Sequence, residues 1–189
     1  TTWVAGYNGQ YNLGDGITTA SPTNSSVAIQ TKKWERGAYS NLTNVADIAA
    51  LSGGTGTGQS CMVITDSGFA YAIGYNANSQ LGIGWQNTTT FNAPGDGNGY
   101  EQIASTPAWL PVRLPPSLAG KVSQIQTIGY KDNATTSYGG FVLVSNTGRA
   151  FICGSGSNVD GFQLGQINYA YGYSDANHNV GILRSMPMD

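Results

Sequence analysis

The chain has 189 residues and a formal net charge of −2, with 27 glycines and only 10% charged residues. Exposed helix faces are normally rich in charged residues, so this composition argues against a helical protein and favours a β-rich domain with many turns. Eight basic residues against ten acidic ones cannot form the positive stripe that nucleic acid requires, and no apolar run has the length of a membrane span, so we expect neither a nucleic-acid partner nor membrane insertion.

The first predicted element is a short strand near the N-terminus. Trp3-Val4-Ala5 leads into Gly6-Tyr7-Asn8, and a Leu-Gly pair follows at Leu13-Gly14. We interpret residues 1–44 as the remnant of a first repeat unit. Trp3–Ala5 is the returning strand of a hairpin whose outgoing strand is absent, and residues 18–38 form an insertion without a repeated pattern.

A complete unit is predicted over residues 45–121. A short apolar segment at Val45, Ile48 and Leu51 precedes two apolar runs, Met62–Thr65 and Phe69–Ile73. Small polar residues before Gly68 indicate a tight turn with positive φ, so the two runs form an antiparallel hairpin. A glycine-rich loop at Gly74–Gly84 and a variable insertion at residues 86–108 follow. We expect four prolines to lie between units: Pro107, Pro111, Pro115 and Pro116.

The third unit, residues 122–189, repeats the second. Val122, Ile125 and Ile128 match the earlier apolar segment, and Phe141–Val144 with Arg149–Cys153 matches the hairpin, so that Met62 aligns with Val142 at an offset of 80. We expect Gly148 to have positive φ. The loop recurs as Gln163-Leu164-Gly165, and residues 169–179 form its insertion.

Units of this size that contain a hairpin and a glycine-rich loop indicate β-propeller blades. The order of strand, glycine turn, aromatic, Gly-x-Asn and Gln-Leu-Gly-x-Gly resembles the regulator of chromosome condensation repeat family. This resemblance implies an all-β fold of the seven-bladed propeller type. The sequence departs from the family at Ser60 and Gly140, where a histidine usually precedes the hairpin's first strand.

Two complete units and a remnant cannot close a seven-bladed ring. The ring is therefore incomplete: the chain is part of a longer polypeptide, or several chains assemble, or another protein covers the sheets. We favour the longer polypeptide, because open blade edges are an aggregation hazard.

The residues indicate no catalytic centre, cofactor or metal site. His178, the only histidine, lies in a polar stretch, and the carboxylates are mostly isolated. Oxygen ligands at alternate positions in Asp96–Glu101 and Asp175–Asn179 are compatible with calcium loops, but ordinary turns have the same composition. Cys61 and Cys153 are expected to be small buried hydrophobes rather than a disulfide.

The glycine-rich loops allow two interpretations. Backbone N–H groups in such loops bind phosphate, but the Lys-Ser/Thr ending of a phosphate loop is absent. We therefore interpret the loops as structural and expect Leu13, Leu81 and Leu164 to pack between blades.

Binding residues are expected in the variable insertions, because loops on a repeated scaffold are where recognition is usually built. The alternative is that their aromatic rings cover the propeller's own flank or a subunit contact. The candidate binding residues are Trp85, Tyr100, Trp109, Tyr169, Tyr171 and Tyr173.

Low charge with abundant Gly, Asn, Thr, Ser and Tyr is typical of fibre and surface proteins. The sequence thus favours a non-enzymatic structural or binding module on a virion or cell surface, such as a phage tail fibre or adhesin. Its partners would be other virion or surface subunits and a host glycan or protein receptor. The resemblance leaves guanine-nucleotide exchange on a small GTPase, or inhibition of a secreted enzyme, as alternatives.

Overall fold

The computed structural model describes residues 1–6, 8, 13–16, 25–35, 38–51, 60–76, 80–83, 105–131, 137–154 and 180–185. Within these ranges the chain is all-β, and no helix capable of crossing a membrane is found there. The strands are β1 (Trp3–Gly6), β2 (Ser25–Gln30), β3 (Lys32–Glu35), β4 (Ala38–Asn41), β5 (Val45–Leu51), β6 (Ser60–Thr65), β7 (Ala70–Tyr75), β8 (Ser105–Pro111), β9 (Val122–Lys131), β10 (Ser137–Ser145), β11 (Ala150–Gly154) and β12 (Val180–Ser185).

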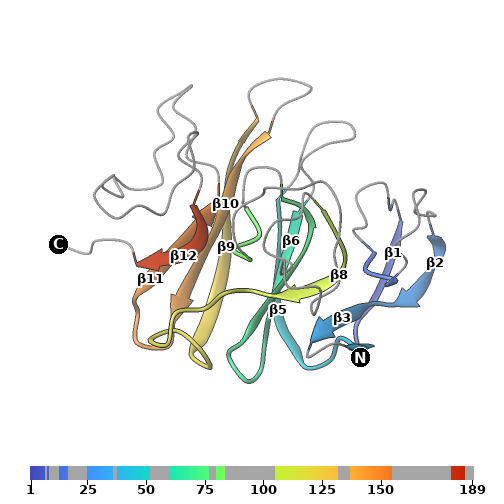
Figure 1. Cartoon of the computed structure of the whole chain (residues 1–189), viewed down its shortest axis with the longest axis horizontal. Coiled ribbons are helices and arrows are strands. Elements are labelled where there is room, and N and C mark those ends of the chain that lie inside the picture. The colour runs from blue at the N-terminus through green and yellow to red at the C-terminus, as the bar shows by residue number, and fades with distance from the viewer. Residues whose placement is uncertain are drawn as a thin grey trace.

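The strands form three sheets, arranged side by side from the N-terminal to the C-terminal end of the molecule (Figure 1). Strands β9 to β12 form a four-stranded sheet, which we call the third blade. Strands β5 to β8 form the second blade, and the hairpin β3–β4 extends it into a six-stranded sheet in the order β4-β3-β8-β7-β6-β5. Strands β1 and β2 form the first blade. These described strands do not close a ring.

Both predicted hairpins are confirmed. In the second blade β6 pairs antiparallel with β7, placing Met62 opposite Ala72, and in the third blade β10 pairs with β11, placing Phe141 opposite Cys153. Their turns contain Gly68 at φ 73° and Gly148 at φ 82°, as a reversal of this kind requires.

The fourth strand of a blade was the element that the sequence did not reveal. Strand β2 lies within the insertion that we predicted over residues 18–38, and β8 begins within the one predicted over residues 86–108 and extends beyond it. The predicted location of two prolines was also wrong, since Pro107 and Pro111 belong to β8 and do not separate units. Proline is tolerated there because β8 meets β3 through a single parallel pair, Lys33 with Trp109, so part of its outer edge carries no ladder.

The sequence predicted that Trp3–Ala5 lacks its outgoing hairpin partner, but it did not reveal that the segment pairs with another strand, β2. β1 pairs antiparallel with β2, with Trp3 opposite Gln30 and Val4 opposite Ile29. This partner lies on the outer side, as β8 does for β7. The outgoing strand, which β6 supplies in the second blade, has no counterpart among the described strands of the first blade.

The Gly-x-Asn and Leu-Gly motifs work together as one structural device. The buried side chain of Asn76 accepts a hydrogen bond through Oδ1 from the Leu81 N–H at 3.0 Å, and Asn8 accepts one from the Leu13 N–H at 2.9 Å. Each asparagine thereby closes the loop, and Leu13 and Leu81 are buried as expected. Leu164 lies outside the described residues. In the two loops that the structure describes, the glycine-rich motif thus has a structural role.

Replacing Asn76 with alanine should lower the free energy of unfolding by about 1–3 kcal/mol, because the Leu81 N–H would then be buried without its acceptor. Asn41→Ala is the matched control, since Asn41 is exposed and its side-chain amide donates to the Gln30 side chain rather than to a buried backbone group. Urea denaturation of the two variants measures the difference. Equal stabilities would contradict the role assigned to Asn76.

The main hydrophobic core lies between the second and third blades. Leu81 packs there with Leu110 of β8 and Phe141 and Cys153 of the third blade. A Cβ on Gly82 would lie 3.1 Å from the sulfur of Cys153, so the glycine-rich loop of one blade lies directly against a strand of the next. The predicted packing of Leu81 between blades is confirmed.

The two cysteines are free thiols. Burial raises the pKa of Cys61 from 9.0 to about 11, and burial raises that of Cys153 to about 12. Both thiols are therefore protonated at neutral pH in the folded chain, where they act as small apolar side chains.

These pKa values predict a loss of stability at alkaline pH. An unfolded thiol ionises near pH 9.0 whereas the folded thiols remain protonated, so the unfolded state binds fewer protons and the free energy of unfolding falls as the pH rises above 9.0. The contribution is fully present below pH 9.0. The variant Cys61→Ala, Cys153→Ala should show a smaller decline between pH 8 and pH 10 in urea denaturation; an identical decline would contradict this origin.

The positions where the repeat family usually has histidine are tightly occupied. The hydroxyl of the buried Ser60 donates to the Tyr75 carbonyl at 2.7 Å. Gly140 lies so close to β11 that a Cβ would overlap the Cys153 carbonyl. No larger side chain fits at Gly140 without movement of the hairpin.

Candidate functional site

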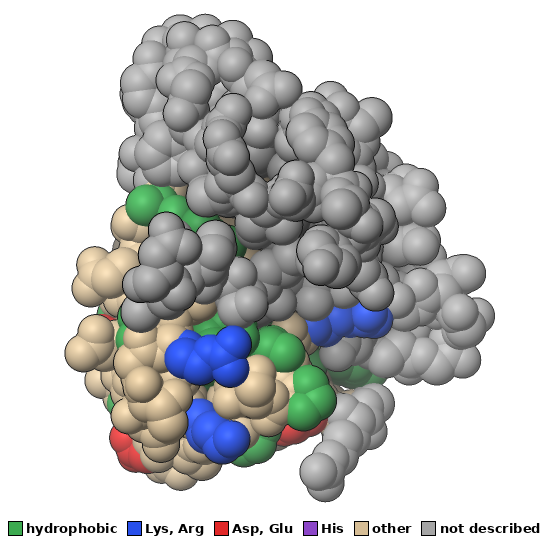
Figure 2. Space-filling view, turned by 90° about the vertical axis from the view of Figure 1, so that its left-hand side faces the viewer, with side chains coloured by type: hydrophobic (Ala, Val, Ile, Leu, Met, Phe, Trp, Pro, Cys, Tyr) green, Lys and Arg blue, Asp and Glu red, His purple; other side chains and the backbone are tan. Residues whose placement is uncertain are grey.

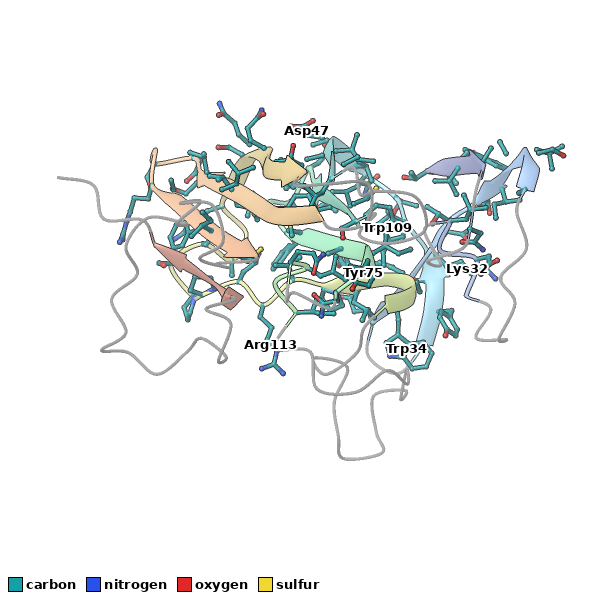
Figure 3. The ribbon with its side chains drawn as sticks, turned by 90° about the horizontal axis from the view of Figure 1, so that it is seen from above. Lys32, Trp34, Asp47, Tyr75, Trp109 and Arg113 are labelled. Atoms are coloured by element: carbon teal, nitrogen blue, oxygen red, sulfur yellow. The ribbon has the colours of Figure 1, made fainter. Side chains whose placement is uncertain are left out.

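The hairpin β3–β4 is an addition to the four-stranded blade and forms the outer end of the six-stranded sheet. Its strands pair over Lys32–Glu35 and Ala38–Asn41, with Trp34 opposite Tyr39. All four residues of β4 are exposed. Figure 3 shows Trp34 on the opposite side of the described strands from Asp47 of β5, and the Trp34 ring packs against the main core.

One face of the hairpin is fixed to the second blade by a polar cluster. The Lys33 Nζ lies 2.8 Å from a Glu35 oxygen and 3.2 Å from the hydroxyl of Tyr71 on β7, and that hydroxyl donates to Glu35 at 3.3 Å. Burial lowers the pKa of Lys33, but its hydrogen bonds to Glu35 and Tyr71 outweigh this and hold the pKa above 10.5. Because the ion pair is partly exposed, its main effect is orientation rather than stability.

The opposite face carries an aromatic pair, because side chains alternate along a strand. The rings of Trp34 and Tyr39 meet edge to face with centroids 4.4 Å apart. Tyr39 is 37% exposed, and burial together with the negative charge of Asp15 raises its pKa, so its phenol remains a hydrogen-bond donor at neutral pH. The Trp34 Nε1 is buried and has no hydrogen-bond partner among the described residues.

This arrangement has the parts of a recognition surface. An aromatic ring offers a flat apolar face, and the Tyr39 hydroxyl, Lys32 and Asn41 supply polar groups on the same side of the hairpin. Among the described residues of the hairpin, the ion pair of Lys33 and Glu35 lies on the other face.

The sequence placed Trp109 among the recognition residues, and this was wrong. Trp109 belongs to β8 and is 1% exposed. It packs with Val63, Tyr71 and Ile73, and its indole N–H donates to Thr31 Oγ1 at 2.7 Å. Trp109 is a core residue, since the insertion that contains it folds back as a strand of the second blade. The other candidates lie outside the described residues: Trp85, Tyr100, Tyr169, Tyr171 and Tyr173.

The metal and histidine candidates are also outside the described residues. These are Asp96–Glu101, Asp175–Asn179 and His178. Within the described ranges, no group of three or more His, Cys, Asp or Glu side chains is placed to hold a metal ion.

Sequence reasoning missed Lys33 and Glu35 because residues 18–38 were interpreted as an insertion without a pattern, and it missed Tyr39, which directly follows that insertion. A signal was present. Four residues on each side of Arg36-Gly37 form a short hairpin pattern, with glycine in a two-residue connection. The segment lacks the apolar alternation of a core strand, and this concealed it.

Comparisons with known proteins support the same fold. No family model matches the sequence, and no curated protein matches it. The solved structure of Kap60 bound to yeast RCC1 (Prp20) superimposes with a TM-score of 0.50 at 14% identity, over 98% of this chain and 32% of that chain. Prp20p from Saccharomyces cerevisiae gives a TM-score of 0.45 at 13% identity, over 98% of this chain and 33% of that one.

The chain thus has an RCC1-like β-propeller fold, as the resemblance in the sequence implied. It spans about a third of the length of these solved chains.

Proposed function

We propose that this protein is a non-enzymatic structural and binding module of a virion or cell surface, in which blades of the RCC1-like fold carry added recognition elements. The observation that carries the proposal is the hairpin β3–β4, which adds the exposed ring of Tyr39 to a blade that is already complete without it; this ring lies edge to face on Trp34, which is partly buried against the main core. The Gly-x-Asn and Leu-Gly motifs of the described repeats close loops and pack in the core. In this proposal, recognition therefore depends on the added segments.

The composition of the surface is compatible with attachment to an uncharged ligand. Charged residues make up only 10% of the chain. On the side of the third blade, Figure 2 shows hydrophobic and uncharged side chains with scattered Lys, Arg, Asp and Glu among the described residues. A host glycan or protein receptor is bound, in this proposal, by Tyr39 together with the aromatic segment at residues 169–173. Neighbouring surface subunits contact the remaining sheet edges.

The experiment compares host-cell and glycan-array binding of the wild-type chain with that of two variants, Tyr39→Ala and the double variant Tyr171→Ala, Tyr173→Ala. Each variant should reduce binding at least fivefold with a melting temperature within a few degrees of wild type. Phe69→Ala is the control, because Phe69 is an aromatic of similar exposure in the turn between β6 and β7. Binding unchanged in both variants would refute the proposal, and release of GDP from a small GTPase without attachment would favour nucleotide exchange instead.

A further inference from the structure

The inner edge of β1 differs from the equivalent edges in the other two blades. Trp3-Val4-Ala5-Gly6 aligns with Tyr71–Gly74 of β7 and Phe151–Gly154 of β11. β7 lies between β6 and β8, and β11 lies between β10 and β12, whereas β1 pairs with β2 alone among the described strands. Among the described strands, one strand position of the first blade is therefore unfilled.

Side-chain exposure follows this difference. Trp3 is 57% exposed, while its equivalents Tyr71 and Phe151 are 6% and 2% exposed. Ala5 is exposed, while its equivalents Ile73 and Cys153 are fully buried. Residues that form core in two blades are at the surface in the first.

The backbone of β1 already has the conformation of a paired strand. Gly6, Gly74 and Gly154 share a positive φ, of 120°, 101° and 132° respectively. A Cβ on Gly154 would lie 2.5 Å from the Gly139 carbonyl oxygen on β10, whereas a Cβ on Gly6 would have no atom within 4 Å. The space that β10 fills beside Gly154 is open beside Gly6.

We propose that the inner edge of β1 is an acceptor for one added antiparallel strand, the outgoing strand of a further repeat unit of the same type. The chemistry of that strand follows from β6 and β10: apolar residues opposite Trp3 and Val4, and a small residue opposite Gly6. In both complete blades the residue at this last position is small, Ser60 opposite Gly74 and Gly140 opposite Gly154. Pairing would bury Trp3 and supply partners for the open N–H and C=O groups of β1.

A second copy of this chain is a poorer occupant. Antiparallel pairing of β1 with another β1 over the full length of the strand would place Trp3 opposite Gly6, where both complete blades have a small residue. The added strand of a repeat unit meets the size requirement at each position.

In the test, a synthetic peptide is added to the wild-type chain. The peptide copies residues 45–66 of this chain and therefore contains β5 and β6. Hydrogen exchange should show at least tenfold slower exchange of β1 amides, and tryptophan emission should shift to shorter wavelength. The emission shift should be absent in Trp3→Phe while the amide protection remains. The control peptide carries Met62→Pro, which removes a ladder N–H and should bind at least tenfold more weakly.

Three outcomes would overturn the proposal: no protection of β1 by the peptide, equal protection by the proline peptide, or sedimentation showing a dimer whose β1 amides are already protected. The last result would assign the edge to a second copy. None of these readouts depends on receptor binding, so the outcome is separable from that of the proposed function.

Discussion

Replacing Trp109 with alanine is expected to lower the free energy of unfolding by about 3–5 kcal/mol, the usual loss when a large buried aromatic is truncated. Trp109 is 1% exposed and fills the cluster formed by Leu42, Val63, Tyr71 and Ile73. Its indole also joins two blades, because Thr31 Oγ1 accepts from Trp109 and donates to the Leu13 carbonyl at 2.7 Å. Urea denaturation followed by circular dichroism measures the loss.

Trp109→Phe is the matched control. It keeps most of the buried ring and loses the hydrogen bond to Thr31, so a smaller loss of about 1–3 kcal/mol is expected. If Trp109 were instead a recognition residue, alanine would reduce binding at unchanged stability. A loss below 1 kcal/mol for Trp109→Ala would contradict its position in the core.

Gly68→Ala should destabilise the chain by about 3 kcal/mol, far more than the equivalent change in the other hairpin. Both Gly68 and Gly148 have positive φ, which costs an alanine about 1 kcal/mol or more. At Gly68 a Cβ would also lie 2.5 Å from the carbonyl carbon of Gly120 and 2.7 Å from the Lys121 nitrogen, so backbone must move. At Gly148 a Cβ would meet nothing within 4 Å.

Gly148→Ala therefore isolates the conformational cost, and the difference between the two variants measures the packing of the second blade's turn against the start of the third blade. Thermal unfolding of both variants side by side gives this difference. Equal destabilisation would mean that the turn at Gly68 does not contact Gly120.

The sequence predicted those parts of the fold that depend on local rules. The hairpins around Gly68 and Gly148 follow from apolar runs joined by a glycine turn, and Leu81 was expected between blades because it recurs with the loop. The fourth strands escaped prediction because they are held by neighbours rather than by pattern: β2 is half exposed, and β8 contains two prolines. The positions of these strands depend on contacts with residues that are distant in the sequence, and a short sequence segment does not reveal such contacts.

The candidate site was predicted less well. Aromatic residues in insertions were expected to be exposed, but Trp109 is buried because its segment returns to the sheet. Tyr39 was missed because a single exposed ring carries no periodic signal. Whether an aromatic side chain serves the core or the surface depends on which strand its segment joins.

The central claim is that the second and third units are adjacent propeller blades with the glycine-rich loop packed between them. A disulfide cross-link tests it most directly. A Cβ at position 82 would lie 3.5 Å from the Cys153 Cβ, within the range that a disulfide spans, so Gly82→Cys in a Cys61→Ser background should form an intramolecular bond with Cys153 on mild oxidation. The control Gly148→Cys, in the exposed turn of the third blade, should not. The account predicts a monomeric product without free thiols for Gly82→Cys and two free thiols for the control; free thiols in both, or a bond only between molecules, would contradict it.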